Sequence, residues 1–383
     1  MSSAAAIEIL AKLVSFDTTS RNSNLPIIDY IESYLSGYGV ECYRVPDDTG
    51  KKSSLFATIG PIGVPGVGLS GHTDVVPVDG QEWDTAPFKL TEKNNRLYGR
   101  GSCDMKAFLA CVMASVPDFN RRSLKMPLHI VFSYDEEVGC TGVRPMIRQF
   151  GERLTRPRMV IVGEPTSMTV VDAHKGPARW HVTITGRPAH SSMAHLGVNT
   201  IAAAGELLGE LAIMEEELKQ GPHNTRFAPP YTTLQVTEIK GGAASNIVPE
   251  KTWFGWEVRG LPGIDHDEIE ARFLTKAKTV AMRMREQAPE ASIEVLRWNQ
   301  VPAFAAAPEA EVVSLALKLA EQNETFTASY ATEASLFEVA GVPCVVCGPG
   351  DIADAHTPNE SIARSEIEKC LMFLERLGDW AES

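Results

Sequence analysis

The sequence predicts an α/β protein in which a larger domain is interrupted by a smaller α+β domain. The chain has 383 residues, which is more than one core usually organises, because single hydrophobic cores stop growing at roughly 250–300 residues. Apolar strands alternate with helices between Ala4 and Gly163 and again after Pro302, as expected for a largely parallel sheet. Between these two parts the predicted order is β-α-β-β-α-β, the split βαβ arrangement of a ferredoxin-like domain.

The larger domain is predicted from two runs of elements. Helices are expected where apolar residues recur every three to four positions, and strands where short apolar runs lie between turn residues. The first run has helices over 4–14, 29–38 and 104–116 and strands over 54–60, 67–70, 128–134 and 159–163. The second has a helix over 309–322, a strand over 343–347 and a helix over 365–377.

The middle of the chain changes to a different pattern. Alternation with period two predicts strands over 179–185, 231–239, 252–258 and 291–298, and helical spacing predicts helices over 199–217 and 267–287. We therefore expect one domain from 1–177 together with 299–383, and an inserted domain over 178–298.

The composition excludes several classes of protein. Lys and Arg number 36 and Asp and Glu 49, so the net charge is −13, which argues against nucleic acid or an anionic membrane as the main partner. There is no run of about 18 apolar residues to cross a membrane, and the first residues are typical of a helix and not of a secretory signal. Seven cysteines without regular spacing indicate reduced thiols and a cytoplasmic protein. We expect Cys344 and Cys347 to be buried in a strand and not to bind metal.

Polar residues lie where predicted strands end or where a helix begins. They are His72, Asp74, Asp104, Glu136, Glu137, Glu164 and His356. The carboxyl edge of an open parallel sheet is where ligands bind, and two His with several carboxylates suit a pair of borderline cations such as Zn²⁺. Taken singly, Asp104 could instead cap the following helix, and Glu164 or His356 could be solvated loop residues.

Two of these segments suggest a division of roles. His72 and Asp74 are two positions apart, so on a strand end they face the same side, and Asp74 is placed to accept the second ring N–H of His72. Glu136 and Glu137 are adjacent and point in different directions. One of them can bind a cation while the other moves protons.

In their order along the chain, these segments resemble the signatures of the M20 family of dinuclear zinc peptidases and deacylases. The matching segments are 72–77, 99–106, 135–139, 163–166 and 355–356. The resemblance covers essentially the whole chain. It implies a zinc-peptidase-like α/β/α catalytic domain with an inserted ferredoxin-like lid, and two Zn²⁺, with Co²⁺ as a possible substitute.

The same resemblance implies the role of each site residue. His72 and Glu164 would hold one cation, and Glu137 and His356 the other. Asp104 would bridge the two, and its peptide bond to Met105 would be cis. Asp74 would orient His72, and Glu136 would be the general base that activates a bridging water.

The resemblance also includes the inserted domain, through segments 188–199, 241–249 and 257–260. It implies a homodimer formed through the lid, in which His190 reaches the partner's active site and stabilises the oxyanion. Asn246 would contact the tetrahedral oxygen, and Arg259 would bind the substrate α-carboxylate. We expect His195 to cap the helix that begins near Asn199.

The segments 332–334 and 348–356 look most like the acetylornithine deacetylase branch of the family. This implies hydrolysis of a small N-acyl amino acid, foremost N²-acetylornithine, as a step of arginine biosynthesis. Glu333 would face the δ-ammonium of the ornithine chain or, alternatively, cap the next helix, and Gly348 would line the substrate site. Sibling activities on succinyl-diaminopimelate, other acylated amino acids or peptides are the nearest alternatives. A non-catalytic binding protein on this fold is a remote one, because Glu136 and all five candidate ligands are present.

Overall fold

The computed structural model describes residues 2–383 and consists of two compact units. One comprises the chain up to Ala173 together with Phe304–Phe326 and Thr332–Ser383, and the other comprises His174–Ala303 and Thr327–Ala331. We describe each unit separately. The domain boundaries at 177/178 and 298/299 stay a prediction.

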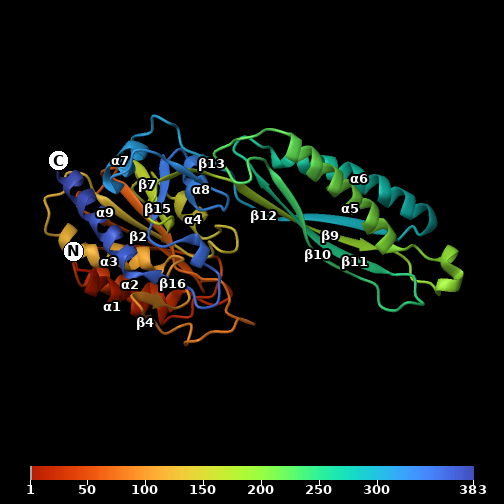
Figure 1. Ribbon diagram of the computed structural model, residues 1–383, viewed down its shortest axis with the longest axis horizontal. Helices are drawn as coiled ribbons and strands as arrows, with labels where there is room; N and C mark the ends of the chain where they lie inside the picture. Colours follow the sequence, from red (N-terminus) through yellow and green to blue (C-terminus); the bar gives the residue numbers. More distant parts are fainter. Residues whose placement is uncertain (1) are drawn as a thin grey trace. The chain divides into compact units, whose positions relative to one another are not determined.

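The first unit is organised by a nine-stranded mixed sheet (Figure 1). Its strands are β1 (Cys42–Pro46), β2 (Ser53–Ile59), β3 (Val67–His72), β6 (Leu128–Ser133), β7 (Met159–Pro165), β8 (Val171–His174), β13 (Phe304–Ala305), β14 (Phe326–Ala328) and β15 (Cys344–Gly348). Their order is β1-β2-β6-β3-β7-β15-β8-β13, with β14 beside β8. The four central strands β6, β3, β7 and β15 are parallel, whereas β1 and β2 on one side and β8 on the other are antiparallel to their neighbours. The carboxyl ends of the four central strands therefore meet at one edge.

Helices cover both faces of this sheet. One face forms a single apolar core with α1 (Ser3–Val14), α2 (Leu25–Ser36), α3 (Lys106–Phe119), α7 (Glu311–Ala320) and α9 (Arg364–Glu382). The other face carries α4 (Val143–Ile147) and α8 (Ala334–Val339), and the rings of Phe56, Phe150 and Phe337 pack there at 6.1 and 6.4 Å between centroids. Helix α3 is buried nearly all round. Gly163 makes room for it, because a Cβ there would lie 2.1 Å from the ring of Phe108.

Three short strands form a separate small sheet. They are β16 (Ser361–Ala363), β5 (Arg96–Tyr98) and β4 (Thr91–Lys93), in that order. The sheet ties the chain just after His356 to the chain just before Asp104, because Ser361 pairs with Tyr98.

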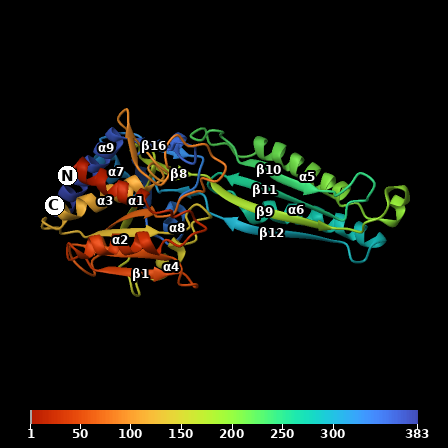
Figure 2. The same cartoon turned by 90° about the horizontal axis from the view of Figure 1, so that it is seen from below.

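The second unit has the predicted ferredoxin-like arrangement. It runs through β9 (Gly176–Thr185), α5 (Thr200–Gln220), β10 (Thr233–Gly241), β11 (Lys251–Gly260), α6 (His266–Gln287) and β12 (Ser292–Gln300), with a short 3₁₀ helix, η1 (Ser191–Leu196), before α5. The four strands are antiparallel in the order β10-β11-β9-β12 (Figure 2), and both helices lie on one side of them (Figure 1). Trp180 and Trp256 stack at 4.0 Å in the core between helices and sheet.

These observations confirm the predicted fold class and correct some details. Helix α2 begins at Leu25, earlier than predicted, because Pro26 suits a first helical turn. The short strands β1, β4, β5, β8, β13, β14 and β16 were not predicted. All seven cysteines are free, and Cys344 and Cys347 are buried in β15 as predicted. Among residues 2–383, no helix is long and apolar enough to cross a membrane.

Candidate metal centre

The structure brings the polar residues that follow the central strands into one cluster. His72 is the last residue of β3, Glu164 lies near the end of β7, and Glu136 and Glu137 follow β6. Asp104 precedes α3, and His356 follows the 3₁₀ helix η2 (Ile352–Asp354). The parallel centre of the sheet explains this convergence, since the ends of neighbouring parallel strands lie side by side.

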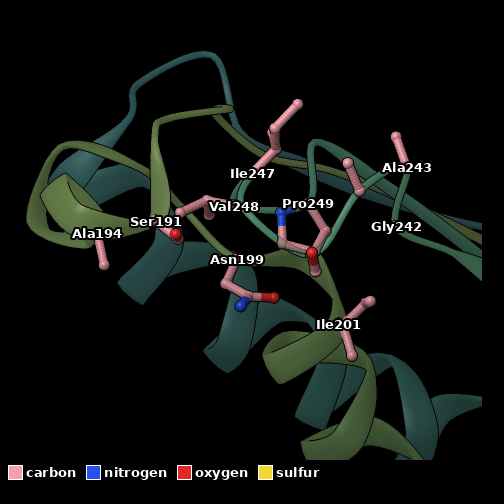
Figure 3. A pocket seen from close by; sticks show the side chains of 11 residues that line it. Ser191, Ala194, Asn199, Ile201, Gly242, Ala243, Ile247, Val248 and Pro249 are labelled. Atoms are coloured by element: carbon pink, nitrogen blue, oxygen red, sulfur yellow. The ribbon is translucent and has the colours of Figure 1, made fainter.

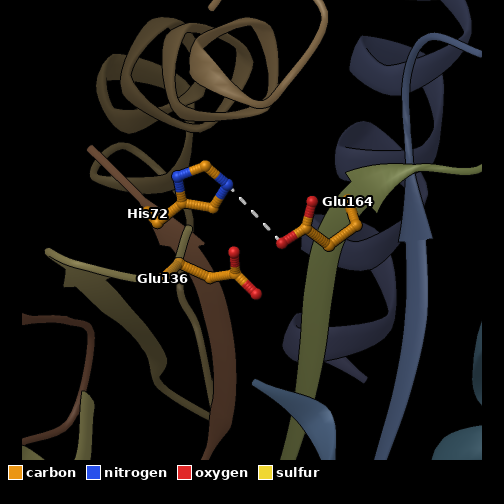
Figure 4. A group of neighbouring side chains, drawn as sticks. All are labelled: His72, Glu136 and Glu164. Carbon is orange, nitrogen blue, oxygen red and sulfur yellow. Dashed lines mark ion pairs between the residues drawn. The ribbon is translucent and has the colours of Figure 1, made fainter. Parts of the chain in front are cut away.

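Asp104 lies between two imidazole rings. Its Oδ1 is 3.1 Å from Nε2 of His72 and its Oδ2 is 3.2 Å from Nε2 of His356. Glu164 approaches the His72 side, with Oε1 3.7 Å from Nε2 (Figure 4), and Glu137 approaches the His356 side, with Oε2 3.0 Å from Nε2. The donors thus form two halves that share one carboxylate.

The capping alternative for Asp104 is wrong. The N-cap position of α3 is occupied by Met105, and no side chain caps that helix. Both carboxylate oxygens of Asp104 point to histidines, and the Asp104–Met105 peptide bond is cis, as the family resemblance implies.

Asp74 orients His72 in a way that differs from the prediction. Nδ1 of His72 lies 2.9 Å from the main-chain carbonyl oxygen of Asp74, whereas the nearest carboxylate oxygen is 3.5 Å away. The carboxylate instead accepts the hydroxyl of Ser20 at 2.7 Å and the main-chain N–H groups of Glu136 at 3.1 Å and Glu137 at 3.4 Å. Asp74 therefore fixes the imidazole through its backbone and the loop of the two acids through its side chain.

The cluster holds more acid than base. Burial raises the pKa of Glu136 to about 8, and the negative charge of Glu137 adds to this effect. Burial and the neighbouring Asp104 also raise the pKa of Glu164 well above its ordinary value. On the other side, hydrogen bonds to Asp104 and Glu137 raise the pKa of His356 to about 10. For the two acids the main cause is burial, which neighbouring negative charges reinforce, whereas for His356 burial acts in the opposite direction and the hydrogen bonds to the acids prevail.

This donor set fits divalent cations. Imidazole nitrogens and carboxylate oxygens are ligands for Zn²⁺ and related ions, and positive charge would offset the excess of carboxylates. Two groups have candidate ligand atoms within 4.8 Å of one another, namely His72, Glu136 and Glu164 (Figure 4) and His72, Asp104 and Glu137. The first group includes Glu136, so the geometry also allows Glu136 to act as a ligand and not only as a base.

Glu333 and Gly348 lie in the interior beside this cluster. Glu333 is 1% exposed, and its carboxylate accepts the hydroxyls of Ser133 and Ser70, the latter at 3.2 Å. Glu333 occupies the N-cap position of α8, but its side chain accepts no hydrogen bond from the helix. The hydroxyl of Thr332 accepts the N–H of Ala334 instead. The capping alternative for Glu333 is therefore wrong. Gly348 packs so closely on β7 that a Cβ would lie 2.0 Å from the carbonyl oxygen of Gly163.

The remaining predicted residues belong to the second unit. His190 is exposed at the start of η1 and accepts the N–H of Ser192, while the carbonyl of Asn246 accepts the N–H of Ser191. Their loops border a cavity of ≈ 420 Å³ (Figure 3). Arg259 on β11 pairs with Glu257 at 2.7 Å.

His195 does not cap α5. The side chain of Asn199 does so by accepting the N–H of Ala202 at 3.0 Å.

Sequence reasoning missed Glu360. Its Oε1 accepts the N–H groups of Cys103 at 2.8 Å and Asp104 at 3.0 Å, and its Oε2 pairs with Nη1 of Arg100 at 2.7 Å. The position of Glu360 only four residues after His356 was the available signal, but nothing local shows that it is buried.

Comparison with known proteins agrees with this geometry. The family model "Peptidase family M20/M25/M40" matches residues 68–379. Acetylornithine deacetylase of Myxococcus xanthus is 37% identical over 377 residues, which covers 96% of this chain and 95% of that protein. The enzyme of the same name from Pasteurella multocida is 34% identical and covers 95% and 93%.

Solved structures share the fold. An M20 family metallo-carboxypeptidase from Sulfolobus solfataricus has a TM-score of 0.78 at 18% identity and covers 98% of this chain and 99% of its own. An aminopeptidase from Bacillus cereus has a TM-score of 0.76 at 21% identity, with complete coverage of both chains. With its family match, its full-length relatives and its cluster of side chains that could hold a metal ion, the chain belongs to peptidase family M20/M25/M40 and is a metal-dependent hydrolase.

Proposed function

We propose that this hydrolase removes the acetyl group from N²-acetylornithine and releases ornithine and acetate. One observation supports amide hydrolysis most directly. Asp104 is buried between two imidazoles, and the carboxyl group of Glu136 lies in the same cluster. The choice of substrate is supported by the relatives that bear this name at 37% and 34% identity over nearly their whole length.

We assign the metal ligands as two sets that share Asp104. His72 and Glu164 would hold one Zn²⁺, and Glu137 and His356 the other, with Co²⁺ as a functional substitute. When bound, such cations polarise the acyl carbonyl and make water a stronger acid. Asp74 keeps Nε2 of His72 directed at the centre, because its carbonyl oxygen holds Nδ1 at 2.9 Å.

Glu136 is the proton carrier in this proposal. Its carboxylate takes a proton from the attacking water, whose oxygen forms a bond to the acyl carbon. The C–N bond then breaks, and Glu136 gives the proton to the leaving amine nitrogen. Without cations, burial raises the pKa of Glu136 to about 8. The positive charge of bound cations would lower this pKa, so that Glu136 starts as the carboxylate that a base requires.

The inserted unit supplies the remaining contacts in this proposal. His190 would stabilise the oxyanion in the partner subunit of a homodimer formed through residues 178–298, Asn246 would contact the tetrahedral oxygen, and Arg259 would bind the α-carboxylate. The planar guanidinium of Arg259 suits a carboxylate, which would take the place of Glu257.

Glu333 would recognise the δ-ammonium of the substrate. It is a buried carboxylate whose hydrogen bonds come from two neutral serines, so a cationic partner would offset the cost of its charge. Gly348 would line the same site. The enzyme would work in the cytoplasm as part of arginine biosynthesis, without nucleic acid or membrane as a partner.

The proposed substrate is tested by kcat/KM of the Zn²⁺-loaded protein. Acetylornithine is compared with succinyl-diaminopimelate, acetylmethionine and a glutamyl dipeptide, and we expect acetylornithine to rank first. A higher value for any of the others would assign the chain to a sibling activity. Glu333→Gln should lower kcat/KM for acetylornithine by about 10–100-fold, from the loss of a charged hydrogen bond of about 1.5–3 kcal/mol. It should change the value for N-acetylnorvaline, which lacks the amine, far less, whereas equal losses on both substrates would remove Glu333 from this role.

A further inference from the structure

We propose that Gln81 is a positioning residue of the metal centre. Its side-chain amide makes hydrogen bonds on two sides. On one side it contacts the buried ion pair of Arg100 and Glu360, which holds the Asp104 loop, and on the other it contacts the main chain of His356. The inference rests on the proposed function, because that proposal makes Asp104 and His356 metal ligands. The inference goes beyond the proposed function by assigning roles to Gln81, Arg100 and Glu360.

The first link holds Asp104. One carboxylate oxygen of Glu360 accepts the main-chain N–H groups of Cys103 and Asp104, and the other pairs with Nη1 of Arg100 at 2.7 Å. The side chains of Arg100 and Glu360 are each only 1% exposed. A buried pair that is also hydrogen-bonded to the main chain is held firmly, because separating its partners leaves an uncompensated charge.

The second link is the amide of Gln81. Its Oε1 accepts Nη2 of Arg100 at 2.6 Å and Nε1 of Trp83 at 3.2 Å. Its Nε2 donates to the carbonyl oxygen of His356 at 3.0 Å. Only this orientation of the amide satisfies all three contacts, because the reverse would set its NH₂ against two donors and its oxygen against a carbonyl. The Trp83 ring also faces the guanidinium of Arg100, at 5.2 Å from the centroid.

His356 needs such a support more than His72 does. His72 ends a central strand, whereas His356 lies in a loop with its side chain 51% exposed and a φ of 61°, a conformation that residues other than glycine seldom adopt. The loop has one further tie to the same segment, from the N–H of Asp84 to the side chain of Asn359 at 2.8 Å. Gln81 is therefore the contact that reaches the main chain of His356 itself.

The test uses substitutions that separate the two ends of the amide. Gln81→Glu keeps an oxygen for Arg100 and Trp83 but places an acceptor against the carbonyl of His356. Gln81→Met keeps the size and removes all three hydrogen bonds. Trp83→Phe keeps the ring over Arg100 and leaves the bond to His356 intact. Gln235→Glu, at an exposed position of β10, is the matched control.

The readout is metal binding by the full-length protein. Zn²⁺ is titrated into the metal-free protein by calorimetry, and the visible spectrum of the Co²⁺ form reports ligand geometry. Wild type should take up two Zn²⁺ per chain. Gln81→Glu and Gln81→Met should weaken one of the two by about 10–100-fold, as loss of a residue that supports a ligand usually does, and should alter the Co²⁺ spectrum. Trp83→Phe and Gln235→Glu should behave as wild type.

Two results would overturn the role of Gln81. They are unchanged affinity for both cations in the Gln81 variants, and an equal loss at both sites with a lowered melting temperature, which would indicate a general defect of the fold. The substrate proposal fails separately. If wild type binds two Zn²⁺ but leaves acetylornithine intact, the substrate is wrong, and selective weakening by Gln81→Glu would still establish the positioning role.

Discussion

Replacing Glu136 by Gln separates the two roles that the geometry allows for this side chain. Gln has the same size and can accept the Cys140 thiol, which lies 3.1 Å from Oε1 of Glu136. The main-chain N–H of residue 136 would still bind the carboxylate of Asp74. We therefore expect Glu136→Gln to fold and to keep the loop geometry, so that a change in rate reports the lost carboxylate.

The expected magnitude follows from the chemistry assigned to Glu136. General acid–base catalysis contributes about 10²–10⁴-fold, or roughly 3–5 kcal/mol at about 1.36 kcal/mol per factor of ten. Both proton transfers pass through Glu136 in our proposal, so we expect kcat to fall toward the upper end of that range. Binding of two Zn²⁺ should stay within about twofold of wild type.

The assay measures kcat and bound metal on the same samples. Glu8→Gln, at an exposed position of α1, controls for loss of a negative charge, and Glu164→Gln shows what losing a ligand does. A Glu136→Gln protein with near-normal kcat would refute the base assignment. A variant that loses metal as Glu164→Gln does would show that Glu136 is a ligand, as its grouping with His72 and Glu164 allows.

Further predictions concern stability and metal. The metal-free protein should lose stability as pH rises from about 5 to 8, because Glu136 holds its proton up to a pKa of about 8 when folded but only to 4.5 when unfolded. Thermal melts should show this slope, and Glu136→Gln should reduce it. Chelation should abolish turnover and lower the melting temperature, and both should recover with Zn²⁺. Trp256→Ala should destabilise the second unit by about 3–5 kcal/mol, because it removes the stack on Trp180, as denaturant unfolding would show.

The centre of the fold was predictable because its signals are local. Buried parallel strands read as continuous apolar runs, and the residues at their ends, His72 and Glu164, could be placed at the sheet edge from the strand assignment alone. Edge strand β1 was missed because Arg44 separates the exposed Tyr43 from the buried Val45 and Pro46 ends the strand, so that the segment gives no apolar run.

The contacts that organise the site could not be predicted, because they join distant parts of the chain. Glu360 holds the main chain of Asp104 across 256 positions, and no local pattern shows that an acid after a loop proline is buried. For Asp104, a local rule predicted the wrong alternative. Its position before a helix favours capping by local rules, but two histidines from distant segments take both carboxylate oxygens.

Part of the negative charge of the chain is concentrated at the candidate metal centre. Asp74, Asp104, Glu136, Glu137 and Glu164 are five of its 49 acids, and without cations burial and mutual repulsion raise the pKa values of Glu136, Glu137 and Glu164. Zinc ligands must be deprotonated, so each bound cation displaces protons from Glu164, Glu137 or His356, whose pKa values are all raised. The charge excess that destabilises the metal-free fold is therefore what the cations neutralise. Metal affinity should therefore rise with pH as these three groups lose their protons, whereas the fall in metal-free stability predicted above follows the proton of Glu136.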